Sequence, residues 1–150
     1  MGSPLFNRKE ITQMFKITQT YTDYDNNEKT QDFYFNLNKV EILEMEAEED
    51  GGYSDMLKRV VASKDSKQLM KLFKQLLLKS YGIKTPEGGF AKSEEISKKF
   101  EQSAAYPEIF MALCTDAQKA SDFVANVMPL SEQQRNDLKT KDITAIPDKT

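Results

Sequence analysis

The residues whose types and spacing most resemble a ligand-binding motif are the acids and amides of the segment Asp23-Tyr24-Asp25-Asn26-Asn27. The spacing Asp-x-Asp-x-Asn matches the opening of an EF-hand loop, whose oxygen ligands bind Ca²⁺. The match ends there: Glu28 stands where the loop needs glycine, and Tyr34 where it needs glutamate. The segment is therefore interpreted as the polar turn of a β-hairpin, and no metal site is predicted.

Catalytic residues are not indicated elsewhere. The chain has no histidine and one cysteine, Cys114, which excludes zinc sites built from cysteine and histidine and Ser-His or Cys-His nucleophile pairs. A P-loop, a dinucleotide fingerprint and a nucleophile elbow are also missing from the sequence. The carboxylates of residues 41–50 leave carboxylate catalysis open as an alternative, but such charge runs are usually solvated helix faces. We therefore predict no enzyme activity, no catalytic residue and no cofactor.

Composition favours a small protein that binds other proteins. The 150 residues suit one domain with its own core, and 39% of them are hydrophobic. The charged fraction is 30% and the net charge is −3, which gives no general attraction to nucleic acid or anionic membranes. No apolar run approaches the roughly 20 residues that span a bilayer. Neither nucleic acid nor a membrane is predicted as a partner.

Two strands are predicted within residues 14–37. Apolar and aromatic side chains alternate with polar ones from Phe15 to Tyr21 and again from Phe33 to Leu37. A lone hairpin is marginally stable in water, so its apolar face is expected to pack on helices or on a partner. Phe33, Phe35 and Leu37 are therefore candidate partner-binding residues.

Helical periodicity dominates the rest of the chain. Asn38 with Glu41 is a capping box that opens a helix, in which Val40 and Leu43 are expected to face inward, with Ile42 as a further candidate. Residues 83–91 contain Pro86 and Gly88-Gly89 and are predicted to form a turn or a small hairpin. The helices are predicted at residues 39–48, 53–62, 66–81, 93–103, 107–114 and 116–127.

These elements predict an α+β fold that is mainly α-helical, with an N-terminal β-hairpin packed on a bundle of five to six short helices. Residues 1–13 are predicted to be a flexible N-terminal segment and residues 14–129 a single domain. Residues 130–150 are polar and are predicted to form a disordered, mobile tail.

A basic face is expected on the helix of residues 66–81. Lys67, Lys71 and Lys74 recur at helical spacing opposite the apolar residues. Solubility is the ordinary explanation of such a face, and docking of an acidic partner helix is the sharper one. We therefore add these lysines to the candidate partner-binding residues. Cys114 lies on the apolar side of its helix and is expected to be a buried structural thiol.

One longer pattern resembles a known protein family. It begins with Phe33-Tyr-Phe-Asn-Leu-Asn-Lys-Val-Glu-Ile-Leu-Glu-Met-Glu46 and continues with Gly51-Gly52, Leu57-Lys58 and the segment Phe73–Tyr81 followed by Gly82. It ends with Ser93-Glu94-Glu95, Phe100, Phe110-Met111-x-Leu113, Thr115-Asp116-Ala117 and Pro129. Over about residues 30–130 this layout is similar to the tail assembly chaperones of siphophages and prophages, mainly those of Gram-positive hosts.

The resemblance implies a mostly helical, self-associating protein of the bacterial host cytoplasm that is absent from the mature virion. Such proteins bind the tape measure protein, keep it soluble and promote assembly of the tail tube around it. A longer, frameshifted form often recruits the major tail tube protein. Two alternatives stay open: another structural or morphogenetic component of a phage tail, and a regulatory protein-binding adaptor.

Overall fold

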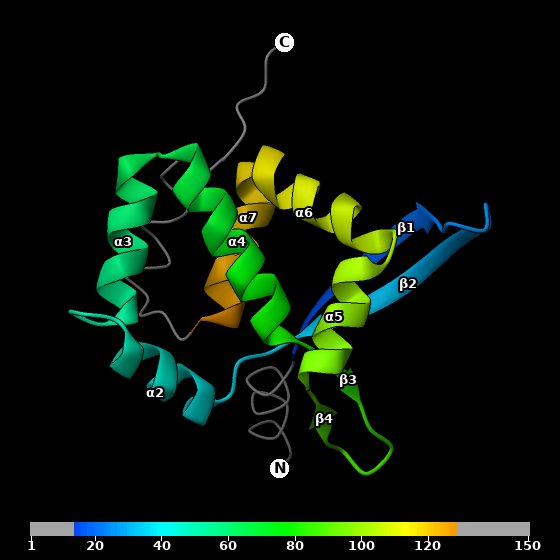
Figure 1. Ribbon diagram of the computed structural model, residues 1–150, viewed down its shortest axis with the longest axis horizontal. Helices are drawn as coiled ribbons and strands as arrows, with labels where there is room; N and C mark the ends of the chain where they lie inside the picture. Colours follow the sequence, from blue (N-terminus) through cyan, green and yellow to red (C-terminus); the bar gives the residue numbers. More distant parts are fainter. Residues whose placement is uncertain (1–13, 129–150) are drawn as a thin grey trace, which may run out of the picture.

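The computed structural model describes residues 14–128 of the chain, in which four strands and six helices alternate along the sequence (Figure 1). The strands β1 and β2 come first, the helices α2, α3 and α4 follow, then the short strands β3 and β4, and finally α5, α6 and α7. The predicted α+β class with a helical majority is confirmed. The proposed segments 1–13 and 130–150 lie outside the described residues, and the domain limits stay a prediction.

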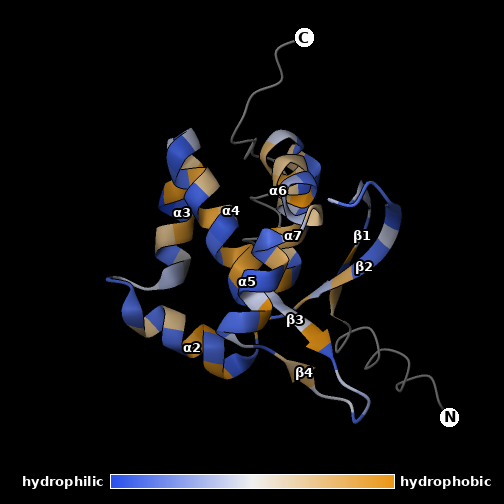
Figure 2. Cartoon of the chain, turned by 45° about the vertical axis from the view of Figure 1, so that its right-hand side comes forward, coloured by the Kyte–Doolittle hydropathy of each residue, from blue (hydrophilic) through white to orange (hydrophobic). Residues whose placement is uncertain are grey.

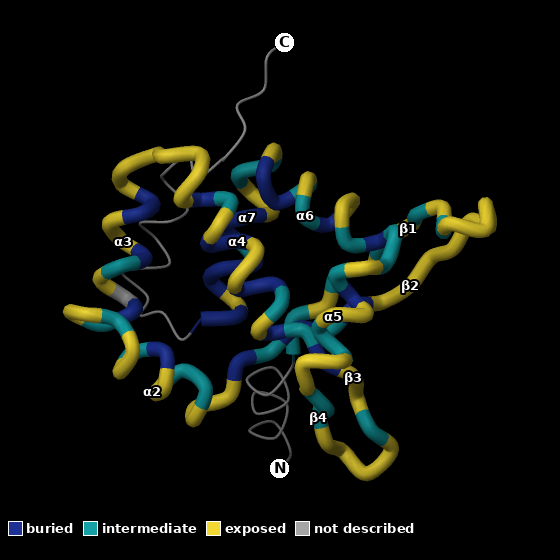
Figure 3. Tube along the Cα trace, viewed as in Figure 1, coloured by how far each residue is buried: buried dark blue, intermediate teal, exposed yellow. Residues whose placement is uncertain are grey.

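The first two strands form a long antiparallel hairpin. β1 (Phe15–Thr22) pairs with β2 (Glu28–Phe35) in continuous register from Phe15↔Phe35 to Thr22↔Glu28. The alternation predicted for β1 is confirmed, since half-buried and exposed residues alternate along it. The first five residues of β2 are exposed, and the outer half of the hairpin projects from the body (Figure 3). Polar pairs such as Thr18 with Asp32, 2.7 Å between Oγ1 and Oδ1, join the strands there.

A second, smaller hairpin completes the sheet. β3 (Tyr81–Lys84) and β4 (Phe90–Ala91) pair with each other, and β3 also pairs with β2 through Tyr34↔Gly82 and Phe35↔Tyr81. The sheet therefore has the antiparallel order β1-β2-β3-β4. Gly82 allows β3 to approach β4 closely, because a Cβ there would lie 2.7 Å from the Phe90 ring and 2.8 Å from the Ala91 carbonyl oxygen. The small hairpin predicted at residues 83–91 is confirmed.

Capping residues set the helix limits near those predicted. α2 (Lys39–Glu48) has the predicted bounds and the predicted capping box: the Asn38 side chain accepts from Glu41 N–H, and the Glu41 side chain accepts from Asn38 N–H. The remaining helices are α3 (Tyr53–Ser63), α4 (Ser66–Ser80), α5 (Glu94–Gln102), α6 (Ala105–Thr115) and α7 (Ala117–Val127). No helix within residues 14–128 is long and apolar enough to cross a bilayer.

The core lies between the helices and one face of the sheet. α4 is central and packs against α3, α5 and α6, while α6 and α7 cover β1 and α5 lies against β3. The apolar positions of α4 are all buried, as their helical spacing predicts: Leu69, Leu72, Phe73, Leu76 and Leu77. Figure 2 shows hydrophobic and hydrophilic parts next to one another along α4.

Candidate partner-binding surfaces

The segment that opens like a calcium loop is a self-contained turn. The Asp23 Oδ1 atom accepts hydrogen bonds from the backbone N–H groups of Asp25 and Asn27, each 2.9 Å long. Its Oδ2 atom pairs with Lys29 Nζ at 3.0 Å. The hydrogen bond from Asn27, together with Lys29, lowers the pKa of Asp23 below its usual range. The carboxylate is thus used by the hairpin itself, in agreement with the turn interpretation, and residues 14–128 contain no group of three potential metal ligands.

Cys114 is a buried thiol, as expected. Cys114 lies on α6 and is fully buried. This burial raises the pKa of its thiol to about 11. The thiol is therefore protonated at neutral pH, when only a thiolate would be an effective nucleophile. Cys114 therefore contributes to core packing and is not a reactive thiol.

The aromatic face of the hairpin belongs to the core. Phe33, Phe35 and Leu37 are 3%, 0% and 6% exposed. The Phe35 ring lies 5.6 Å from the Phe123 ring and 5.8 Å from the Phe100 ring, centre to centre, so helices of the same chain cover it. These three side chains therefore pack into the core of the chain itself, and their role in partner binding stays a prediction.

The basic face of α4 is accessible. Lys67, Lys71 and Lys74 are all exposed, on the side of α4 opposite its buried leucines. Lys74 Nζ lies 3.4 Å from a carboxylate oxygen of Glu101 on α5, an exposed contact of small energy. The geometry brings the three lysines onto one surface, and their role in binding stays a prediction.

An apolar ridge lies on the outer side of α2. Val40 is 62% exposed and Leu43 is 69% exposed, and Ala47, one turn further along the helix, is exposed too. We call these three residues the α2 ridge. The prediction that Val40 and Leu43 face inward is wrong: α2 packs against α3 through its other side, where Met45 is 3% exposed.

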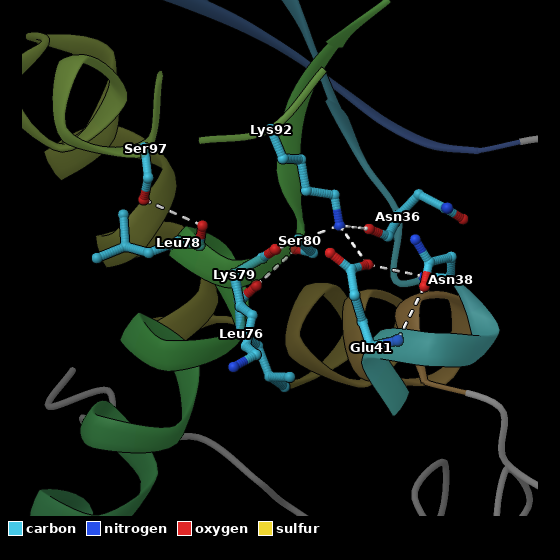
Figure 4. A network of polar contacts seen from close by, with 9 residues as sticks. All are labelled: Asn36, Asn38, Glu41, Leu76, Leu78, Lys79, Ser80, Lys92 and Ser97. Carbon is cyan, nitrogen blue, oxygen red and sulfur yellow. Dashed lines mark hydrogen bonds and ion pairs between the residues drawn. The ribbon is translucent and has the colours of Figure 1, made fainter. Parts of the chain in front are cut away.

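A lysine that the sequence did not single out holds α2 in this orientation (Figure 4). Lys92 Nζ donates to the backbone oxygen of Asn36 at 2.5 Å and to Glu41 Oε1 at 2.6 Å, and more weakly to the backbone oxygen of Lys79 at 3.3 Å. The side chains of Lys92 and Glu41 are only 17% and 24% exposed. Lys92, which directly follows β4, thus joins the start of α2 to the residue after β2 and to the end of α4.

The other end of α2 is also fixed by a carboxylate. Glu46 Oε1 accepts a hydrogen bond of 3.1 Å from the backbone N–H of Tyr53, the first residue of α3. Glu44 and Glu48, in contrast, are exposed. The acidic run therefore contains two kinds of residue. Glu41 and Glu46 make contacts that stabilise the fold, whereas Glu44 and Glu48 face solvent, as expected for a solvated helix face.

Two hollows also mark the surface of residues 14–128. One, of about 370 Å³, lies between the sheet and α5, with an aromatic and aliphatic lining of Phe33, Tyr81, Ile83, Ile96 and Phe100. The other, of about 210 Å³, lies between β1 and the helices α6 and α7. Both are partly open to solvent, and both also have polar side chains in their lining.

These features define a class: a small α+β protein with exposed apolar and basic surfaces and, in its described part, no group of potential metal ligands. Comparison with family models identifies the family to which the chain belongs. The model of a phage tail assembly chaperone family matches residues 14–148, and the chain belongs to this family. Membership of a chaperone family indicates a non-enzymatic role. No curated protein and no solved structure matches the chain.

Proposed function

We propose that the chain binds the tape measure protein of its phage, keeps that protein soluble in the bacterial host cytoplasm and promotes assembly of the tail tube. The observation that carries this proposal is the family match, which spans residues 14–148 and therefore every described strand and helix. The chain then acts during assembly and is absent from the mature virion.

The physical requirements of that role agree with the surfaces described above. A long helix with exposed apolar stripes aggregates unless those stripes are covered. A chaperone for it needs an apolar face and a polar border but no reactive group. The α2 ridge supplies the first, and the charged side chains of α2 and α4 supply the second.

Co-expression with the tape measure protein tests the proposal. The tape measure protein expressed alone is expected in the insoluble fraction, and with the chain it is expected in the supernatant, co-purifying with it. The proposal is wrong if the tape measure protein stays insoluble and no complex forms. The same experiment, repeated with the major tail tube protein and any frameshifted longer product, tests recruitment of tube subunits.

Mass spectrometry of purified virions separates a chaperone from a structural tail component. The chain should be abundant in infected cells and missing from washed particles. Stoichiometric amounts in the particles would assign it to the tail structure.

A further inference from the structure

The α2 ridge is unusual because two large apolar residues of the helix, Val40 and Leu43, face solvent while Met45 and Ile42 pack inward. Among the exposed large hydrophobic residues within residues 14–128, Val40 and Leu43 are two that lie within one helical turn. An amphipathic helix of a globular protein normally turns such residues toward the core. Here α2 buries Met45 and packs Ile42 against the core, but its exposed apolar residues are as large as its buried ones, so apolar burial alone does not explain how the helix is oriented.

Polar contacts fix that orientation instead. The capping box at Asn38, the Lys92–Glu41 contact of 2.6 Å and the bond from Tyr53 N–H to Glu46 hold both ends of the helix. The capping box fixes where the helix begins, and the contacts of Glu41 with Lys92 and of Glu46 with Tyr53 would be lost or strained if α2 rotated to bury its ridge. The ridge is therefore presented in advance of binding, which lowers the conformational cost of docking.

We propose that the α2 ridge is the docking face for an amphipathic helix of a partner protein, one whose apolar stripe is bordered by lysine or arginine. Val40, Leu43 and Ala47 follow the spacing of successive a, d and a positions in a heptad, the seam at which helices pack side by side. Ala47 is small enough to allow a close approach. At ten residues, α2 presents a seam about 15 Å long.

Charge selects the partner. Glu44 and Glu48 are exposed and follow one border of the ridge, with Glu44 at the e position that pairs with charges of a neighbouring helix. A basic border on the incoming helix complements them. An antiparallel pair of α2 helices from two copies of the chain would set Glu44 against Glu44, which disfavours that arrangement. That the basic helix is a stretch of the tape measure protein rests on the proposed function.

A synthetic helix tests the docking face directly. The probe is a three-heptad peptide with leucine at the a and d positions and lysine at e and g, titrated into the full chain by fluorescence anisotropy. We expect the double variant Val40→Ser/Leu43→Ser to bind it at least tenfold more weakly than the natural chain. A peptide with glutamate in place of every lysine should not bind, and Glu44→Lys/Glu48→Lys should reverse that preference.

A matched control removes an exposed apolar residue elsewhere. Met111 on α6 is 48% exposed, so Met111→Ser is expected to leave peptide binding unchanged. Leu43→Glu and Met111→Glu form a second pair. Each adds a carboxylate that attracts a basic peptide, so weaker binding to Leu43→Glu alone reports the lost apolar contact. Circular dichroism and the melting temperature of each variant confirm that the fold is intact.

The inference would be overturned by no binding to the natural chain, by equal binding to the ridge variants, or by a dimer in sedimentation equilibrium that Leu43→Glu converts to a monomer. Such a dimer would assign the ridge to a second copy. Co-expression separates this inference from the proposed function. If Leu43→Glu solubilises the tape measure protein as well as the natural chain does, the ridge assignment fails and the function stands. If the natural chain cannot solubilise it, the function fails and the peptide decides the ridge.

Discussion

Replacing Lys92 by methionine isolates the contact that holds α2 in place. Methionine has a similar length but no charge and no donor, so the variant loses the bonds to Asn36 O and Glu41 Oε1, 2.5 and 2.6 Å long. Breaking a fully buried ion pair costs about 3–5 kcal/mol, and hydrogen bonds to charged groups contribute about 1.5–3 kcal/mol. Because the two side chains are 17% and 24% exposed, we expect a loss of about 2–3 kcal/mol in the free energy of unfolding.

Urea denaturation followed by circular dichroism measures that loss. For a chain of this size it corresponds to a decrease in melting temperature of about 4–12 °C. Lys98→Met is the matched control, because Lys98 is exposed on α5 and makes no ion pair with the described residues. Hydrogen exchange should locate the damage in α2, whose amides should lose protection before those of α4. If Lys92→Met and Lys98→Met lose equal stability, the reasoning about the tether is refuted.

Three further predictions concern the core. The Tyr53 hydroxyl is buried without a hydrogen-bond partner among the described residues, so Tyr53→Phe should raise the free energy of unfolding by about 1 kcal/mol in urea denaturation; a decrease would reveal a partner. Leu76→Ala, at a fully buried position of α4, should lower it by about 3 kcal/mol, whereas a loss under 1 kcal/mol would contradict the packing. Burial raises the pKa of Cys114 to about 11 from 9.0, so the folded thiol holds its proton where the unfolded one loses it. Stability should therefore fall as pH rises from about 9 to 11, and Cys114→Ala should remove that component.

Local signals in the sequence predicted most of the secondary structure. Asn38 with Glu41 defines the start of α2 from side-chain chemistry alone, and the leucine spacing of α4 identifies its buried face without reference to any neighbour. The turn at Asp23 follows from the same local logic, because its carboxylate bonds residues two and four positions away. Such features need only a few consecutive residues.

Features set by distant contacts were not predictable in this way. The pairing of Tyr34 with Gly82 joins the two hairpins into one sheet, and no local pattern signals it. Val40 and Leu43 follow a helical spacing that ordinarily indicates a buried side, but Lys92 and Tyr53 fix the helix with that side outward. The aromatic residues Phe33 and Phe35 are apolar enough for either a core or an interface, and only the position of α5 and α7 decides between them.

The Lys92–Glu41 contact also has a consequence for the time at which the protein becomes competent. It joins residues 51 positions apart in the sequence, so this tether of α2 cannot form on a nascent chain until Lys92 has left the ribosome. Before that point α2 is held only by contacts with nearer residues, such as the bond from Tyr53 N–H to Glu46. The α2 ridge is therefore fixed at both ends only after most of the domain has been made, and a truncated product ending before Lys92 would lack the tether at the start of α2.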